Sequence, residues 1–212
     1  MGSLEARLAR LRAESPSNAA RLIFRKLVYR KVVLRRYEIK AAESLAPSMP
    51  FNLQISFLEA TNFDQASGTS PYLTSEDVER FRQQDSICIV VRDGDRVAAS
   101  SWMTSGNVYV PELHRFIHVP QGEHLSCRTY VNPDYRGRAL MSHMIHAYSQ
   151  RLSPGDVVWG PVYERNVASI RSIERIGWRH TGDYWTRFIF GKKLPGERHF
   201  AARSPETLGG AG

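Results

Sequence analysis

The spacing of apolar residues in the first half of the chain follows a period of two. Apolar and polar residues alternate over residues 51–60, which predicts a strand. Residues 86–104 hold two apolar stretches around Asp93-Gly94, a dipeptide typical of tight turns, so we expect a β-hairpin there. Between these segments, residues 74–84 open with Thr-Ser-Glu-Asp, whose hydroxyl and acidic groups favour the N-terminus of a short helix.

The second half of the chain alternates strands with helices. Strands are predicted at residues 125–131, 157–163 and 183–190, with one helix ending near Leu152 and another running from Asn166. An antiparallel hairpin precedes this alternation. The pattern therefore predicts an α+β fold, with a mixed sheet covered by helices.

The two ends of the chain differ in composition from its middle. Residues 1–50 are expected to form a basic, largely helical extension, within which residues 32–39 are also β-prone. Residues 51–191 form the predicted domain, which contains an insertion at 105–123 with two prolines. The tail 192–212 is rich in Gly, Pro, Ser and Ala and is predicted to be flexible.

Net charge is concentrated in the N-terminal extension. The chain carries a formal net charge of +8, and residues 1–40 contain 11 Lys and Arg against 3 Asp and Glu, which is 11 − 3 = +8. The domain itself is therefore neutral, which argues against a protein that binds nucleic acid over its whole surface. Two interpretations of the extension stay open: attachment to an anionic membrane surface or acidic partner, and packing on the domain with Lys and Arg heads in solvent.

Composition favours a soluble protein of a reducing compartment. The mean hydropathy is −0.38, and no run of roughly 18 apolar residues is present to span a membrane. The N-terminus lacks a signal-peptide pattern. Cys88 and Cys127 both fall in predicted strands and are interpreted as small buried hydrophobes. A cytoplasmic location is expected, with a peripheral membrane contact left open.

The segment from Leu125 to Trp178 points most directly to chemistry. A strand ends at Val131, a tight turn holds Arg136-Gly137-Arg138, and a helix follows. A strand that feeds a turn opening a helix aims unpaired backbone N–H groups and the positive helix end at one point. Such an arrangement predicts a site for a diphosphate.

Two motifs in this segment resemble those of the GCN5-related N-acetyltransferases, over roughly residues 51–190. The first is the strand end and diphosphate turn, matched by Val131, Pro133, Tyr135 and Arg136. The second motif begins at the predicted helix that runs from Asn166, and it is matched by Asn166, Ser169, Glu174, Gly177 and Trp178. The combination with a basic extension is also similar to members associated with bacterial surface-polysaccharide synthesis.

The resemblance implies a mostly antiparallel sheet that splays in its middle, with acetyl-CoA or another acyl-CoA lying in the splay as cosubstrate. The residues implied for acyl-CoA binding are Thr129, Tyr130, Val131, Arg136, Gly137, Arg138, Ala139, Leu140, Met141, Asn166 and Ser169. The chain departs from the family pattern at the two small-residue positions of the turn, which hold Ala139 and Met141 rather than glycines. It also has Ile173 where a proton-donating tyrosine is common, and Leu125 where some members have a glutamate.

Acyl transfer to an amine or hydroxyl also needs a group that takes a proton and a group that gives one. Glu123 and Glu164, near the ends of two strands, are the candidate bases, and Tyr184 is the candidate donor to the leaving thiolate. The loop histidines His114, His118 and His124 are further candidates for a base or for acceptor binding. Cys127 could act as a covalent nucleophile, but a strand cysteine among apolar residues usually belongs to the core. No metal-ligand pattern is present, and no metal is expected.

The sequence thus predicts an acyl-CoA-dependent acyltransferase acting directly on a small-molecule or membrane-proximal acceptor, such as an amino sugar. Two other classes stay open. One is a binding module of the same fold that has lost catalysis, and the other is an anionic-membrane or nucleic-acid binder working through residues 1–40.

Overall fold

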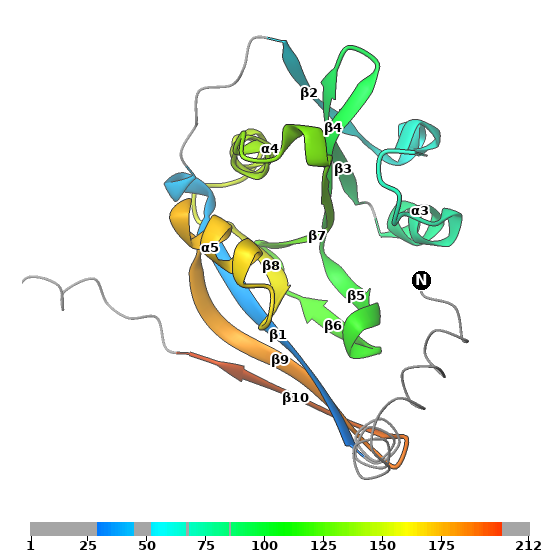
Figure 1. The fold of residues 1–212 in the computed structure, drawn as a ribbon, viewed down its shortest axis with the longest axis vertical. Coiled ribbons are helices and arrows are strands. Elements are labelled where there is room, and N and C mark those ends of the chain that lie inside the picture. Colours follow the sequence, from blue (N-terminus) through cyan, green and yellow to red (C-terminus); the bar gives the residue numbers. More distant parts are fainter. Residues whose placement is uncertain (1–28, 45–51, 67, 85, 201–212) are drawn as a thin grey trace, which may run out of the picture.

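The computed structural model describes residues 29–44, 52–66, 68–84 and 86–200, which are organised around one eight-stranded sheet (Figure 1). Its strands in chain order are β1 (Tyr29–Lys40), β2 (Leu53–Leu58), β3 (Ile87–Asp93), β4 (Arg96–Thr104), β7 (Glu123–Val131), β8 (Val157–Tyr163), β9 (Arg179–Ile189) and β10 (Lys192–His199). They lie in the order β10-β9-β1-β8-β7-β4-β3-β2. Only the β7–β8 pair among them is parallel, so the mixed, mostly antiparallel sheet expected from the sequence is confirmed.

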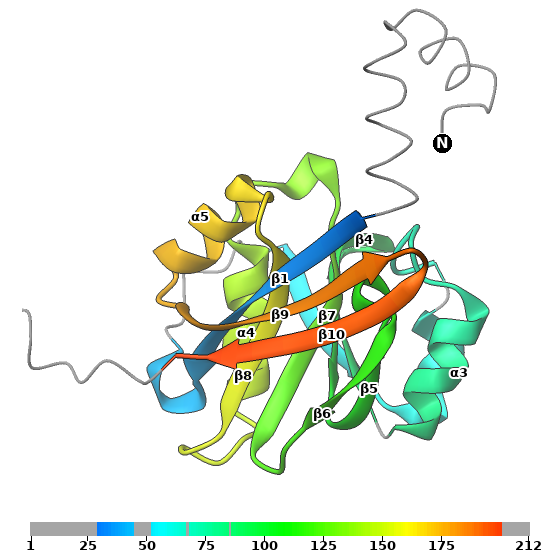
Figure 2. The same cartoon turned by 90° about the horizontal axis from the view of Figure 1, so that it is seen from below.

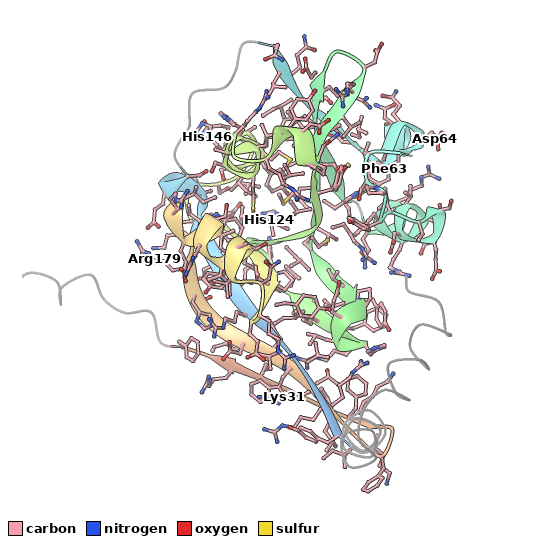
Figure 3. All side chains as sticks on the ribbon, in the orientation of Figure 1. Lys31, Phe63, Asp64, His124, His146 and Arg179 are labelled. Carbon is pink, nitrogen blue, oxygen red and sulfur yellow. The ribbon has the colours of Figure 1, made fainter. Side chains whose placement is uncertain are left out.

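Helices cover both faces of this sheet. On one face, α4 (Leu140–Ser149) and α5 (Val167–Arg175) bury Met144, Ile145 and Ile173 against the strands. On the other, α3 (Ser75–Gln83) and the 3-10 segment Ala60–Ala66 pack on Trp102. Figure 3 shows these two sides through its labelled residues His146, on α4, and Phe63, on the opposite face.

Local sequence signals explain the start of α3 and the turn between β3 and β4. The Thr74 hydroxyl accepts a hydrogen bond from the Asp77 backbone N–H at 3.1 Å, and the Asp77 carboxylate accepts one from the Thr74 backbone N–H at 3.2 Å. This reciprocal capping box fixes the start of α3 where the sequence predicts it. The β3–β4 hairpin turns at Gly94, whose φ of +55° suits a residue without a side chain.

The first described strand lies in a different place from the one expected. We predicted that the domain begins at residue 51, yet β1 sits inside the sheet between β8 and β9 (Figure 2). Leu34 and Tyr37 are almost fully buried, and Arg36 is buried with its charge matched by Glu38 at 3.0 Å and by Glu123 at 2.9 Å. The ion pairs of Arg36 allow this charged sequence to be buried as a strand. Residues 29–40 therefore belong to the domain and not to the expected extension. Residues 1–28 lie outside the described residues.

The predicted tail also contributes a strand. β10 pairs with β9 along its whole length, in place of the flexible segment expected from residue 192. The turn between them has Phe190 at φ +46° and Gly191 at φ +76°, the left-handed pair that a type I′ hairpin requires. Gly196 fits because a Cβ there would approach the Trp185 ring to 2.5 Å, so the sequence uses glycine for a close contact across the strands.

The insertion at 105–123 forms a second, two-stranded sheet on the α3 side of the molecule. β5 (Gly106–Val110) and β6 (Arg115–Val119) are antiparallel and are joined by a 3-10 turn, Pro111–Leu113. Leu113 is fully buried, and its carbonyl accepts a hydrogen bond from the Thr186 hydroxyl at 2.7 Å. The hairpin is thereby tied to β9 and held against the middle of the main sheet.

Candidate active site

The central parallel pair of strands separates soon after it forms. β7 and β8 pair only from Glu123 to Leu125 and from Val157 to Trp159. Farther along β7, Arg128 has a left-handed φ of +49°, and the register with β4 shifts at this point, which marks a β-bulge. The facing edges of the two strands beyond Leu125 therefore offer backbone N–H and C=O groups that do not pair with each other.

A cavity of about 1050 Å³ occupies this splay. Its walls include residues of α4 and α5, on one face of the sheet, and of α3 and the β5–β6 hairpin, on the other. Because residues from both faces line one cavity, the cavity passes through the sheet between β7 and β8. Two molecules entering from opposite faces would meet at the splay.

The turn before α4 provides the most distinctive chemistry in the cavity wall. Gly137 (φ +79°) and Ala139 (φ +53°) both adopt left-handed conformations. Among the described residues, no oxygen accepts a hydrogen bond from the backbone N–H groups of residues 137–142, and α4 has no side-chain cap. These donors line the cavity together with Arg136 and Arg138. A row of free N–H groups at a helix N-terminus with two guanidinium groups is suited to bind a diphosphate.

The aromatic ring beneath this turn holds it in place. Tyr135 is buried and donates a hydrogen bond to the Asp93 carboxylate at 2.9 Å. The Arg138 guanidinium lies 5.1 Å from the centre of the Tyr135 ring. The hydrogen bond raises the pKa of Tyr135, so the phenol stays protonated and the contact persists through the neutral range.

The structure brings nearly all of the sequence-predicted acyl-CoA residues to this one cavity. Those that line it are Thr129, Val131, Arg136, Gly137, Arg138, Ala139, Leu140, Met141, Asn166 and Ser169. Tyr130 is the exception, because its ring packs against Tyr72 and borders a separate hollow. Asn166 also acts as the N-cap of α5, since its side chain accepts a hydrogen bond from the Ser169 N–H at 3.2 Å.

The three residues expected to move protons lie elsewhere. Arg36 donates hydrogen bonds to Glu123 at 2.9 Å and to the Tyr184 hydroxyl at 3.4 Å, and both of these side chains lie outside the cavity wall. Tyr184 is buried, and burial raises its pKa. Glu164 follows β8 as an exposed residue outside the cavity wall. The physical reason is the strand alternation, which turns Glu123 and Tyr184 toward the same buried arginine.

The candidate histidines are likewise outside the cavity wall. His114 lies 3.3 Å from Arg30, and His118 lies 3.1 Å from the Asn107 side chain. His124 lies 3.1 Å from the Tyr148 hydroxyl under α4, and burial lowers the pKa of its imidazole. These contacts assign the three rings to packing and surface bonds rather than to the splay.

Sequence reasoning missed the polar groups of the α3 side of the cavity. Arg128, at the bulge, forms an ion pair with Asp77 at 3.0 Å. Burial acts to raise the pKa of Asp77, but the hydrogen bonds from Thr74 and the Arg128 charge outweigh it and lower the pKa. Glu112 and Tyr163 also line this cavity. The capping box revealed Asp77 only as a helix residue, and nothing local revealed that it faces the splay.

Cys127 is expected to react slowly with alkylating reagents. Burial raises the pKa of its thiol to about 12, as it does for Cys88. The thiolate is the reactive form, so iodoacetamide at about pH 8 should label either cysteine about 10³-fold more slowly than in the urea-unfolded chain. Peptide mass spectrometry follows the labelling. Cys127 lines the cavity and is partly exposed, so its rapid labelling in the folded protein would contradict the raised pKa and reopen a covalent role.

Ala139→Gly is expected to stabilise the protein. A left-handed conformation costs an L-residue roughly 1–2 kcal/mol, and glycine avoids this cost. Part of the benefit is lost because glycine has more conformational entropy in the unfolded chain. The net effect should raise the melting temperature by about 1–4 °C. Ala168→Gly, the same change at an exposed position of helix α5, should lower the melting temperature, because glycine is a poor helix former. Thermal scans of both variants check the pair, and a loss of stability in Ala139→Gly would contradict the strain at the turn.

Comparison with known proteins supports the fold. No protein-family model matches the chain, and no curated protein matches it. Among solved structures, it is similar to GCN5-related N-acetyltransferases from Kribbella flavida (13% identity, TM-score 0.52) and Sphaerobacter thermophilus (15%, 0.54). The alignments cover 81% and 86% of this chain and 63% and 59% of theirs. A conserved protein of unknown function from Staphylococcus epidermidis is also similar, with 12% identity, a TM-score of 0.54, and coverage of 82% of this chain and 68% of that one.

The chain thus has the fold of GCN5-related N-acetyltransferases, as the sequence motifs predicted. It spans about six-tenths of the length of the two acetyltransferases named. Identities this low establish the shared fold, and the activity has to be argued from the cavity.

Proposed function

We propose that this protein is an acyltransferase that moves an acyl group, most simply acetyl, from acyl-CoA to an amine or hydroxyl acceptor. The observation that carries the proposal is the row of free backbone N–H groups at residues 137–142, with Arg136 and Arg138, opening into a cavity that crosses the sheet. That row fits a diphosphate, and the cavity gives the rest of a coenzyme a path into the splay.

The splayed strand edges would bind the pantetheine arm. This arm is extended and carries amide groups, so it can hydrogen-bond along β7 at Thr129 and Val131 as an added strand does. Backbone N–H groups near the bulge at Arg128 are suited to polarise the thioester carbonyl. Asn166, at the start of α5, borders the arm on the β8 side. When bound, the coenzyme supplies the activated acyl group, and the protein residues position it.

Tyr163 is the proposed proton donor to the leaving thiolate, in place of the absent tyrosine at Ile173 and of Tyr184. It stands at the end of β8, lines the cavity and keeps its side chain half-exposed. Burial of the remainder and the nearby Glu112 charge raise the pKa of its phenol. A raised pKa keeps the hydroxyl protonated at neutral pH, which is the state a donor needs.

Two alternatives make different predictions. A binding module that has lost catalysis would hold coenzyme A without consuming the thioester, and the departures at Ala139, Met141 and Ile173 motivate it. A binder of anionic membranes or nucleic acid through residues 1–40 has less support, because residues 29–40 form β1 and its Arg36 is buried in ion pairs. In the part of the chain that the structure describes, none of the helices could span a lipid bilayer.

Two measurements on the purified full chain test this proposal. Calorimetric titration with acetyl-CoA should show micromolar-range binding at one site per chain. Release of free coenzyme A, followed with a thiol reagent, should then depend on added acceptors; glucosamine, spermidine and lysine are tried as amines and glucose as a hydroxyl. Binding without thiol release for any of them would favour the silent module, and absence of binding would overturn the proposal.

A further inference from the structure

The end of the main sheet at which β1 begins projects beyond the neighbouring strand β8 (Figure 1). β1 pairs with β8 only from Leu34 onward, whereas its pairing with β9 starts at Tyr29. β10 continues this part of the sheet on the other side of β9. The outer ends of β1, β9 and β10 therefore form a three-stranded wing. Residues 29–33 of β1 give it a length of about 17 Å beyond β8, at about 3.3 Å per residue.

The tip of this wing exposes three large apolar side chains. Phe190, in the turn between β9 and β10, is 75% exposed, Leu194 is 49% exposed and Tyr29 is 44% exposed. Tyr29 lies opposite Ile189, the last residue of β9 before this turn, so the three side chains come together from three segments of the chain. Large apolar groups that gather at one exposed point indicate an interaction surface.

Basic side chains lie beside these apolar groups. Lys31 is opposite Arg187 in the β1–β9 register, and Arg187 is opposite Leu194 in the β9–β10 register. By strand alternation, Lys31, Arg187 and Lys192 lie on the same face of the wing as Tyr29 and Leu194, and all three basic residues are exposed. Among the described residues, no carboxylate forms an ion pair with any of these three basic groups.

The nearest acidic residues do not neutralise the wing tip. Asp183, on the same face but farther from the tip, is paired with Arg198 at 2.8 Å. Glu197 lies on the opposite face, where it pairs with Arg115 of the β5–β6 hairpin at 3.2 Å. Glu164 follows β8 at the base of the wing. Three basic groups against this one carboxylate leave the outer end of the wing positive.

Two features of the wing tip weaken the fold instead of supporting it. Lys31 and Arg187 are directly opposite each other, and like charges at such positions in a sheet repel. Phe190 has a left-handed φ of +46°, which is unfavourable for a bulky residue, and its ring is not buried in return. A partner that is both anionic and apolar would compensate for both costs.

We propose that the wing tip docks the protein on a membrane that contains anionic lipids. The docking surface consists of three exposed apolar and three exposed basic side chains: Tyr29, Phe190 and Leu194, and Lys31, Arg187 and Lys192. The apolar groups enter the boundary between headgroups and acyl chains, a depth at which aromatic side chains are favoured. The basic groups bind the anionic headgroups beside them.

A bilayer fits this surface better than two other partners do. The phosphates of a nucleic acid would match the basic groups, but the aliphatic side chain of Leu194 has no ring to stack on a base. A second copy of the chain would cover the apolar groups but would bring the same positive charges together. The surface also differs from the basic segment 1–40 considered above, because two of its three strands come from residues 179–199. It requires no acyl-CoA, so it is independent of the function proposed above.

Sedimentation of the full chain with lipid vesicles tests the proposal. The protein should sediment with vesicles that contain phosphatidylglycerol and phosphatidylcholine, and only weakly with phosphatidylcholine alone. Binding should fall when the ionic strength rises from about 0.1 M to 1 M, because the range of charge attraction shrinks from about 10 Å to 3 Å.

Two sets of substitutions at the wing tip separate its apolar and basic parts. Phe190→Asn removes the ring and keeps a residue that suits the left-handed turn, and it should weaken vesicle binding about tenfold or more. Replacing Lys31, Arg187 and Lys192 together by Gln should weaken it about 100-fold, at about fivefold for each basic group near the lipid surface. Because strain or repulsion is removed, neither protein should melt at a lower temperature than the wild type.

Matched controls change the same residue types elsewhere. Phe116→Asn removes a ring that is 64% exposed on β6, and Gln in place of Arg82, Arg96 and Arg151 removes three positive charges on other surfaces. Both controls should bind vesicles as the wild type does.

Several results would overturn the proposal. The full chain could bind neither kind of vesicle, or both equally. The wing-tip variants could bind as tightly as the wild type, which would place membrane binding in another part of the chain. Binding of an oligonucleotide, or self-association in size-exclusion chromatography, that is lost in the wing-tip variants while no vesicle is bound would assign the surface to a nucleic acid or to a second copy.

Discussion

Arg138→Glu is expected to weaken acetyl-CoA binding by about 10- to 150-fold. A hydrogen bond between charged groups contributes about 1.5–3 kcal/mol, which corresponds to that range of affinity, and the reversed charge adds repulsion from the diphosphate. Arg138 borders the cavity beside the free N–H groups of the turn and bonds to no described carboxylate, so the variant removes no folding contact other than its stacking on Tyr135. Calorimetric titration with acetyl-CoA measures the change.

Arg179→Glu serves as the control for this charge reversal. Its side chain is 68% exposed, lies at the start of β9 and does not line the cavity. The same change in net charge at this position should leave the affinity within about twofold, since exposed charges are screened by salt over about 10 Å. Equal losses in both variants would mean that net charge, and not the turn, governs binding. An unaffected Arg138→Glu variant would remove the diphosphate from this turn.

Tyr37→Ala is expected to lower the free energy of unfolding by about 3–5 kcal/mol, the usual cost of truncating a buried large aromatic residue. Tyr37 is 1% exposed, its ring stacks on His180 at 5.1 Å, and its hydroxyl donates a hydrogen bond to Glu174 on α5 at 2.9 Å. The residue therefore ties β1 both to the core and to the helix that borders the cavity. Urea denaturation followed by tryptophan fluorescence measures the loss.

Tyr29→Ala on the same strand provides the comparison. Tyr29 is 44% exposed, so its truncation should change the unfolding free energy by about 0.5 kcal/mol or less. A large difference between the two variants is the signature of a strand buried in the sheet. If Tyr37→Ala were as mild as Tyr29→Ala, residues 29–40 would not be a buried strand, and they would return to the extension expected from the sequence.

The part of the cavity wall formed by residues 136–142 was predictable because its geometry is local. A strand end, a turn with Gly137 and a following helix place their N–H groups together regardless of the rest of the chain. The N-cap role of Asn166 is local in the same way, whereas its place beside the cavity was implied by the family resemblance. The splay itself follows from the resemblance of two motifs and not from any single residue.

The strands at the two ends of the domain could not be predicted, because their pairing is non-local. β1 pairs with strands more than a hundred residues away, and the basic pairs along it hide the alternation that would mark a strand. Arg36 in particular is a buried charge that is balanced by Glu38 on the same strand and by Glu123, a partner that is distant in the sequence. For β10, the turn at Phe190 uses a bulky residue at positive φ, which sequence patterns do not associate with a hairpin.

The structure places the candidate acid and base residues outside the cavity wall for a related reason. Glu123 and Tyr184 stand on the expected strands, but which face each presents depends on the strand register and on Arg36 between them. Glu112 was missed because it lies in an insertion that looked like a loop. The β5–β6 hairpin places it in the cavity wall, and no short motif marks that placement.

A crystal structure of the protein with coenzyme A bound tests the donor site most directly. We expect the diphosphate to accept hydrogen bonds from the backbone N–H groups of residues 137–142, and the pantetheine arm to run between β7 and β8 toward Arg128. Coenzyme A bound on another surface, or a splay that stays empty when the protein is soaked in the coenzyme at millimolar concentration, would contradict the proposed function.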